Sequence, residues 1–183
     1  MALTATIYNV HVDLADSNRG VYEALDLRVA RHPSESAEFM VVRILAYCLE
    51  HTEGIAFTDG VSSGDEPAVL VRDLTGRITT WIEVGLPDPA RLHRASKAAD
   101  RVAVYTHRDV RQYLAQFSGE RIHRADDIVV RALDRPAVEA LAARLDRRAS
   151  FALSVDGNDL TVSLDEGSVV VHVSEHSLTE ARR

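Results

Sequence analysis

Two acidic segments, each beside an apolar run, carry the strongest chemical signal in the chain. Asp65-Glu66-Pro67 opens one apolar run, and Glu83 lies inside the next, Trp81-Ile82-Glu83-Val84-Gly85. An isolated carboxylate in a buried strand is costly because it loses its hydration. A divalent cation shared with a second carboxylate would offset that cost. Two carboxylates on neighbouring strands, between two helices, are the arrangement of metal-dependent phosphodiester hydrolases, although Gly85 stands where such sites usually carry a lysine.

The elements that must position these acids can be read from the middle of the chain. Pro33-Ser34 predicts the start of a helix with Ser34 as its N-cap, and Asp88-Pro89 predicts the start of a second helix. Apolar runs predict strands at 55–57, 68–71, 78–84 and 102–105. A helix that joins two strands predicts a parallel crossover, whereas tight turns predict antiparallel pairs. The predicted class is therefore α/β with a mixed central sheet and flanking helices.

The flanks of the chain add further strands and helices. Alternating apolar residues over 4–14 and 21–30 predict an N-terminal antiparallel hairpin. Helices are predicted at 108–117 and 136–145, on either side of a strand at 128–133. Strands at 151–155, 160–164 and 169–173 predict a C-terminal antiparallel meander. We expect one domain over residues 1–183.

Composition narrows the class of partner. The net charge of −7 argues against a protein that coats DNA. Residues 91–148 nevertheless hold 13 Lys and Arg against 8 Asp and Glu, while the rest holds 8 against 20. This asymmetry indicates either a polyanion-binding surface beside a cation site or ordinary solvated helix faces.

The single cysteine, Cys48, falls in an apolar helical pattern and predicts a small buried side chain. Without a signal peptide or an apolar span, the chain is expected to be cytoplasmic and not bound to a membrane.

Four motifs together resemble the YaeQ family, with a likeness that runs over nearly the whole chain. They are Ala5-Thr6-Ile7-Tyr8, Ala30-Arg31-His32-Pro33-Ser34-Glu35, Asp65-Glu66-Pro67 and Trp81-Ile82-Glu83-Val84-Gly85-Leu86-Pro87-Asp88. The resemblance implies a fold of the PD-(D/E)XK, or restriction-endonuclease-like, superfamily. The common core of that superfamily is helix, three strands, helix, strand, which is the order read above from the residues alone.

The resemblance also implies a set of site residues. Asp65 and Glu83 would be the metal-binding acids, assisted by Glu38 or Glu35 from the first helix. The basic group would come from the second helix, since Gly85 replaces the usual lysine. The candidates are Arg94 and Lys97, followed by Arg91 and His93. Such a site would hold Mg²⁺ or Mn²⁺, which activates a water and polarises the phosphate. Lys97 can accept a proton when desolvated, whereas an arginine can only clamp phosphate.

Three functions follow from these expectations. The first is a nuclease-like protein with a variant PD-(D/E)XK site that hydrolyses phosphodiesters with Mg²⁺ or binds nucleic acid. The second is a non-catalytic interaction protein that retains the nuclease fold and meets a protein partner. The third is a hydrolase of small phosphorylated or nucleotide ligands. A deep closed pocket would favour this third function over an open groove.

Overall fold

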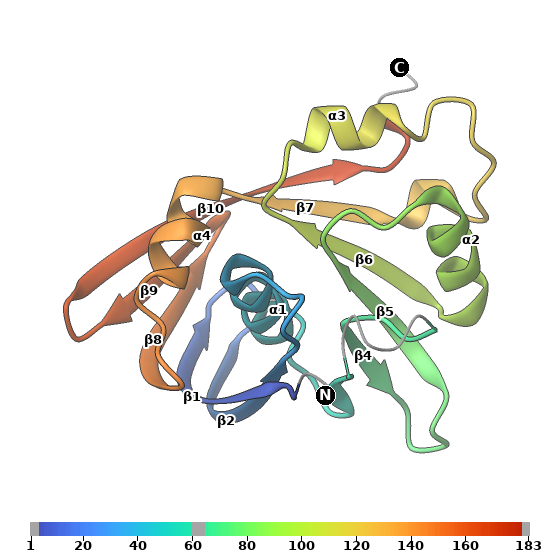
Figure 1. Cartoon of the computed structure of the whole chain (residues 1–183). Coiled ribbons are helices and arrows are strands. Elements are labelled where there is room, and N and C mark those ends of the chain that lie inside the picture. The colour runs from blue at the N-terminus through green and yellow to red at the C-terminus, as the bar shows by residue number, and fades with distance from the viewer. Residues whose placement is uncertain (1–3, 60–64, 181–183) are drawn as a thin grey trace.

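The computed structural model describes residues 4–59 and 65–180, in which ten strands form one curved sheet with four α-helices beside it (Figure 1). The strand order is β2-β1-β8-β9-β10-β7-β6-β5-β4-β3. The strands are β1 Thr6–Asp16, β2 Val21–Arg31, β3 Ile55–Phe57, β4 Val69–Arg72, β5 Ile78–Val84, β6 Arg101–Thr106, β7 Val129–Leu133, β8 Arg148–Asp156, β9 Asp159–Leu164 and β10 Gly167–Ser177. The helices are α1 Ala37–Leu49, α2 Pro89–Ala98, α3 Val110–Ala115 and α4 Arg135–Ala142.

The pairing of the strands makes the sheet mixed, as the sequence predicts. β1 and β2 form the N-terminal antiparallel hairpin, and β8, β9 and β10 form the antiparallel meander. The crossover through α2 joins β5 to β6 in parallel, and β6 pairs in parallel with β7. The sequence does not predict two further pairings: β1 lies parallel to β8, and β10 reaches from the meander to β7. These two pairings merge the hairpin, the meander and the middle strands into one sheet.

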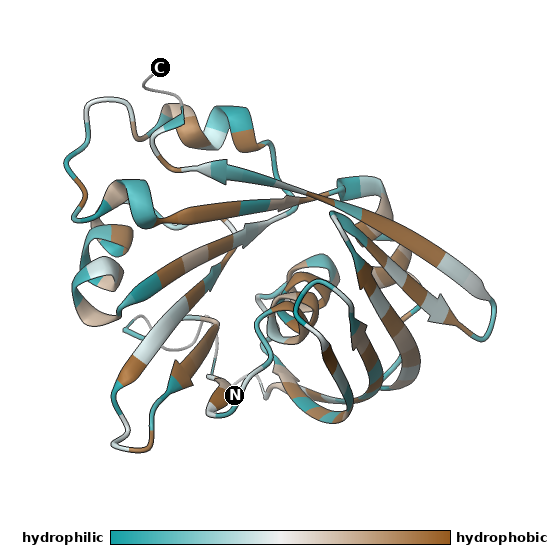
Figure 2. Cartoon of the chain, turned by 180° about the vertical axis from the view of Figure 1, so that it is seen from behind, coloured by the Kyte–Doolittle hydropathy of each residue, from teal (hydrophilic) through white to brown (hydrophobic). Residues whose placement is uncertain are grey.

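Helix α1 lies in the hollow of the curved sheet (Figure 1). The sequence predicts one apolar face on this helix, but every residue from Met40 to Ala46 is buried, and so is Cys48. A helix that is apolar on nearly all sides belongs inside a core. The strands around α1, together with α4, complete that core. Apolar residues accordingly recur along α1 and along the strands that curve around it (Figure 2).

The opposite face of the middle strands has a core of its own. Trp81 on β5 packs there with Leu92 of α2, with Tyr113 of α3 and with Phe117 just after α3. Side chains alternate along a strand. Glu83 therefore lies on the α2 side with Trp81, while its neighbours on β5 face α1.

Two helix starts differ from the sequence prediction. Ser36, not Ser34, caps α1, and its Oγ accepts a hydrogen bond from the backbone N–H of Phe39 at 3.1 Å. Glu35 therefore precedes the helix and is buried instead of lying in its first turn. The helix predicted over 108–117 is shorter, because Asp109 caps α3 and the helical residues are 110–115. Within the described residues, no helix combines the length and apolar character needed to cross a membrane.

Candidate functional site

A cavity of about 900 Å³ lies where the middle strands of the sheet end. Its wall includes the carboxyl end of β5, the segments directly after β6 and β7, and the segment before α1. β5, β6 and β7 run parallel, so their carboxyl ends meet at one edge. This is the edge at which open α/β sheets bind ligands. The wall residues considered below are Glu35, Ser36, Glu83, Arg91, His107, Arg108 and Arg135.

Glu83 is a buried carboxylate in the wall of this cavity, with its side chain 5% exposed. Its Oε1 accepts hydrogen bonds from Arg91 Nε at 2.6 Å and from Trp81 Nε1 at 2.7 Å. Trp81 lies two residues earlier on the same face of β5, so strand geometry brings this donor to the acid. The charge-assisted bond from the guanidinium offsets the loss of hydration. The cationic partner of the strand acid is thus an arginine.

The first turn of α2 holds Arg91 in place. Asp88 caps the helix and accepts a hydrogen bond from the backbone N–H of Arg91 at 2.7 Å. Pro89 occupies the first helical position, where its missing N–H costs nothing. The Arg91 guanidinium also donates from Nη2 to the carbonyl of Glu66 at 2.7 Å. Arg91 therefore links α2 both to β5 and to the segment before β4.

Of the four basic candidates on the second helix, Arg91 lines the cavity and the others do not. Arg94 and Lys97 are exposed. The Nδ1 atom of His93 accepts a hydrogen bond from the backbone N–H of His123 at 3.3 Å. An α-helix rises about 1.5 Å per residue. Since α2 runs back from the cavity toward the start of β6, each residue after Arg91 lies farther from Glu83.

Backbone geometry explains why a glycine stands where a lysine is usual. Gly85 has φ of +99°, a conformation that residues with a Cβ rarely adopt. Its N–H donates to the carbonyl of Tyr105 at 2.9 Å, which continues the pairing with β6 just beyond the end of β5. A lysine at this position would be strained whatever space surrounds it.

The structure separates the predicted acids. Asp65 is exposed and does not line the cavity, whereas its neighbour Glu66 does. Glu35 lines the cavity, but both of its carboxylate oxygens accept hydrogen bonds from Arg43 Nη1 at 3.0 Å. Both side chains of that pair are 0% exposed. Glu35 is therefore engaged by Arg43, and Asp65 is not beside Glu83 in the cavity wall.

Glu38 lies on the first turn of α1, partly buried and outside the cavity wall. Hydrogen bonds from its own backbone N–H and from the Ser36 hydroxyl lower the pKa of Glu38, and the positive charges of His107, when it is protonated, and of Arg108 add to that effect. Glu38 thus carries a negative charge at the positive end of the helix dipole.

These positions decide whether a divalent cation fits at Glu83. The guanidinium of Arg91 lies 2.6 Å from Glu83 Oε1, and its positive charge repels a cation at that oxygen. Across residues 4–59 and 65–180, no group of three or more His, Cys, Asp and Glu side chains could hold a metal ion. The described side chains therefore do not fit Mg²⁺ or Mn²⁺ at Glu83 while Arg91 is bound to it.

His107 and Arg108, which line the cavity directly after β6, are not among the site residues predicted from the sequence. His107 is 7% exposed, and its Nδ1 is buried with no hydrogen-bond partner in the described part of the chain. Burial lowers the pKa of His107, and the charge of Arg108 lowers it further, so the imidazole is neutral at pH 7. Their place directly after a predicted parallel strand was the signal that could have found these residues.

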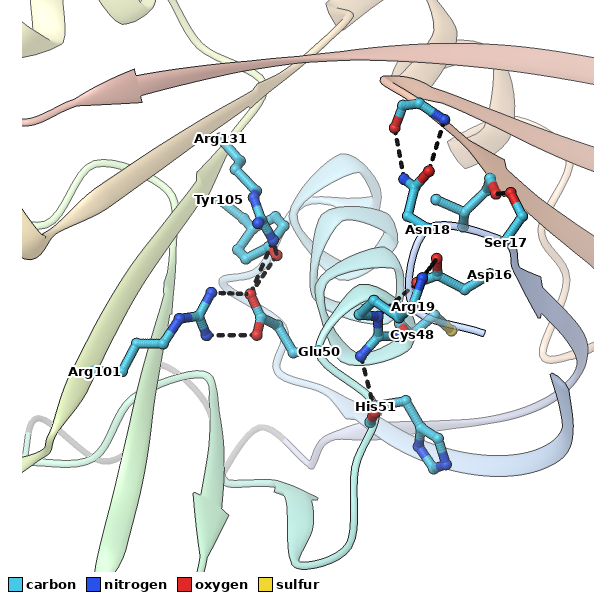
Figure 3. A network of polar contacts seen from close by, with 12 residues as sticks. Asp16, Ser17, Asn18, Arg19, Cys48, Glu50, His51, Arg101, Tyr105 and Arg131 are labelled. Atoms are coloured by element: carbon cyan, nitrogen blue, oxygen red, sulfur yellow. Dashed lines mark hydrogen bonds and ion pairs between the residues drawn. The ribbon is translucent and has the colours of Figure 1, made fainter. Parts of the chain in front are cut away.

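A second cluster of charged side chains, the Glu50 cluster, joins the end of α1 to β6 and β7 (Figure 3). Its members are Glu50, Arg101, Tyr105 and Arg131. Arg101 donates to Glu50 from both Nη atoms at 2.6 and 2.9 Å, the Tyr105 hydroxyl donates at 2.6 Å, and Arg131 Nη1 donates at 3.1 Å. Burial alone would raise the pKa of Glu50, but the hydrogen bonds and the two arginine charges outweigh it and lower the pKa. An acid at the negative end of a helix needs such cations.

We expect the Glu50 cluster to make stability depend on acid pH. Because folding lowers the pKa of Glu50, the unfolded chain binds a proton more readily than the folded chain does. The resulting stabilisation is present above the ordinary value of 4.5 and is lost as pH falls through the lower folded pKa. The free energy of unfolding of Glu50→Gln should therefore fall less than that of wild type below pH 4.5, as measured by urea denaturation. The exposed Glu53→Gln should follow wild type, and parallel curves for all three proteins would contradict this role.

Comparison with known proteins gives a consistent result. A family model described as "YaeQ protein" matches residues 1–173. The chain is 32% identical over 175 residues to a YaeQ protein of Escherichia coli (strain K12), which covers 95% of this chain and 97% of that protein. The crystal structure of the YaeQ protein from Xanthomonas axonopodis pv. citri has a TM-score of 0.88 at 30% identity, covering 95% of this chain and 99% of that one. The YaeQ crystal structure from Pseudomonas syringae has a TM-score of 0.88 at 32% identity, covering 93% and 95%.

Proposed function

Because the chain belongs to the YaeQ family, we propose that its middle elements form a restriction-endonuclease-like core and that its cavity binds the phosphates of nucleic acid. The order α1, β3, β4, β5, α2, β6 supports the core assignment, since it is helix, three strands, helix, strand. The position of the cavity, beyond the carboxyl ends of three parallel strands, supports a ligand site within that core.

The ion pair between Glu83 and Arg91 is the observation that favours binding over hydrolysis. In a metal-dependent hydrolase the strand acid is a ligand of the cation. Here a guanidinium held by α2, by Glu83 and by the Glu66 carbonyl takes that place. An arginine stays protonated, so it can clamp a phosphate but cannot activate water. In this proposal the protein keeps a nuclease fold but recognises nucleic acid without hydrolysing it.

The number of available arginines around the cavity limits how many phosphates the cavity can bind. Arg91 is paired with Glu83, and Arg135 is paired with Glu139 at 2.7 Å. Arg108 makes no side-chain hydrogen bond or ion pair with any described residue. With so few available cations, we expect contact with about one or two phosphates, and therefore a shallow dependence of affinity on salt.

A small phosphorylated ligand is the second candidate. The volume of about 900 Å³ favours it. Small-molecule sites are typically about 300–1,000 Å³. A free nucleotide carries the same phosphate chemistry as a nucleotide within a strand. The test therefore includes both free nucleotides and nucleic-acid strands.

The test is a fluorescence-anisotropy titration with labelled single-stranded RNA, single-stranded DNA and duplex DNA, in EDTA and in Mg²⁺. We expect saturable binding of at least one nucleic acid in EDTA and intact substrate in Mg²⁺. Unlabelled nucleotides serve as competitors, and Arg144→Gln is the matched control because Arg144 is exposed and outside the cavity wall. Failure of all three nucleic acids to bind would overturn the proposal. Mg²⁺-dependent cleavage that Glu83→Gln abolishes would overturn binding without hydrolysis and establish the hydrolase.

A further inference from the structure

The N-terminal end of α1 lies at the cavity wall and carries unused hydrogen-bond donors. Ser36, the N-cap of this 13-residue helix, lines the cavity. The backbone N–H groups of Ser36 and Ala37 form no hydrogen bond with any described residue. The N-terminus of a helix carries a partial positive charge, and its free N–H groups suit an anion.

A buried side chain without a partner stands in the same part of the cavity. His107 lines the cavity, and its Nδ1 has no hydrogen-bond partner among the described residues. Leaving a buried polar atom unsatisfied is costly. Because the imidazole is neutral and its enclosed Nδ1 meets no described donor or acceptor, the proton can sit on Nε2, which is not among the enclosed atoms and can donate to a bound oxygen. This donor is independent of the helix end.

Arg108 supplies a full positive charge next to both features. It follows His107 directly and lines the cavity. Its charge acts on His107 and on Glu38, so it lies near the first turn of α1. The charge of Arg135 acts on the same two groups but is shared with Glu139. Arg108 is therefore the cation that is available to a ligand.

We infer that this end of the cavity, the α1 subsite, binds a terminal phosphate group of a nucleic acid. This inference rests on the proposed function, in which the rest of the strand binds in the cavity. The α1 subsite comprises the N–H groups of Ser36 and Ala37, the imidazole of His107 and the guanidinium of Arg108. A terminal phosphate has three unbridged oxygens and up to two negative charges, which match several converging donors. A phosphate inside a strand has only two such oxygens.

The negative charge of Glu38 repels a bound phosphate, so removing it should change the phosphate affinity in the opposite sense to removing Arg108. Its carboxylate already accepts hydrogen bonds from its own N–H and from the Ser36 hydroxyl, and it remains charged. A bound phosphate must therefore overcome the charge of Glu38 at close range. Removing that charge should strengthen phosphate binding, whereas removing the charge of Arg108 should weaken it. A purely structural role of these side chains predicts no such opposite effects.

The first arm of the experiment uses inorganic phosphate as the probe and follows backbone amide resonances by NMR. We expect the Ser36 and Ala37 amides to shift saturably with phosphate. The dissociation constant should rise about 10-fold in Arg108→Gln and fall several-fold in Glu38→Gln. Arg111→Gln is the matched control, because Arg111 is an exposed arginine on α3 outside the cavity wall. Absence of shifts at these amides with millimolar phosphate would overturn the α1 subsite.

The second arm compares short oligonucleotides that carry a phosphate at the 5′ end, at the 3′ end or at neither end. We expect one of the phosphorylated forms to bind about 10-fold more tightly than the unphosphorylated form, and Arg108→Gln to remove that preference. Equal affinity for all three oligonucleotides would overturn the subsite while leaving nucleic-acid binding intact. Binding of inorganic phosphate without binding of any oligonucleotide would support the subsite and overturn the proposed function.

Discussion

Replacing Arg43 with methionine is expected to lower the free energy of unfolding by about 3–5 kcal/mol. Arg43 is fully buried on α1, and its Nη1 donates to both oxygens of Glu35 at 3.0 Å. The substitution removes the buried guanidinium that pairs with the Glu35 carboxylate in the core. Urea denaturation at neutral pH measures the loss, with the slope of the transition checked for two-state behaviour.

The double variant Glu35→Met with Arg43→Met is the control for that prediction. Removing both charges avoids the stranded carboxylate, and buried pairs replaced by apolar residues often lose little stability. Arg43 also donates to the carbonyls of Ala30 and Thr58, at 3.3 and 3.4 Å, so some loss remains. We expect the double variant to recover at least half of the single loss. A double variant less stable than Arg43→Met would contradict the role assigned to the ion pair.

The second large effect is expected for Arg91→Ala, which should impair both stability and binding. Its removal leaves the buried Glu83 carboxylate with Trp81 as its remaining described donor and should cost about 3 kcal/mol. It also removes a guanidinium from the cavity wall, so affinity for a nucleic acid should fall about 10-fold. Thermal or urea denaturation and anisotropy titration measure the two effects on the same preparation.

Two further variants separate these effects. Glu83→Gln with Arg91→Ala should recover most of the stability, because no charge is left buried, but should not recover the affinity. Arg91→Lys keeps the charge and loses the geometry that reaches both Glu83 and the Glu66 carbonyl. Its affinity should therefore lie between wild type and Arg91→Ala. Full affinity in Arg91→Ala would show that this arginine does not meet the ligand.

The order of elements could be predicted because each depends on local patterns. Alternation along β1 and β2, the proline and aspartate at the start of α2, and the glycine turns of the meander all act within a few residues. The pairing of β1 with β8 and of β10 with β7 could not be predicted in the same way. These pairs join residues far apart in the chain, and no local pattern specifies which strands become neighbours in a sheet.

Only the part of the candidate site that depends on local patterns could be predicted. Glu83 was found because a charge in a buried strand needs a partner, and Glu83 is buried in the cavity wall. The identity of that partner depended on where α2 begins relative to β5, which favours Arg91 over Arg94 and Lys97. Glu35 was assigned to a helix terminus, but the later start of α1 places it against Arg43 instead.

The measurement that tests the central claim most directly is ultraviolet cross-linking of a bound oligonucleotide, mapped by mass spectrometry in EDTA. If the cavity binds nucleic-acid phosphates, the cross-linked peptides should come from its wall, chiefly residues 84–91 and 107–116. Arg91→Ala should reduce their yield, and Arg144→Gln should not. Cross-links confined to other surfaces, such as the exposed arginines at 144, 147 and 148, would contradict the assignment of the cavity as the binding site.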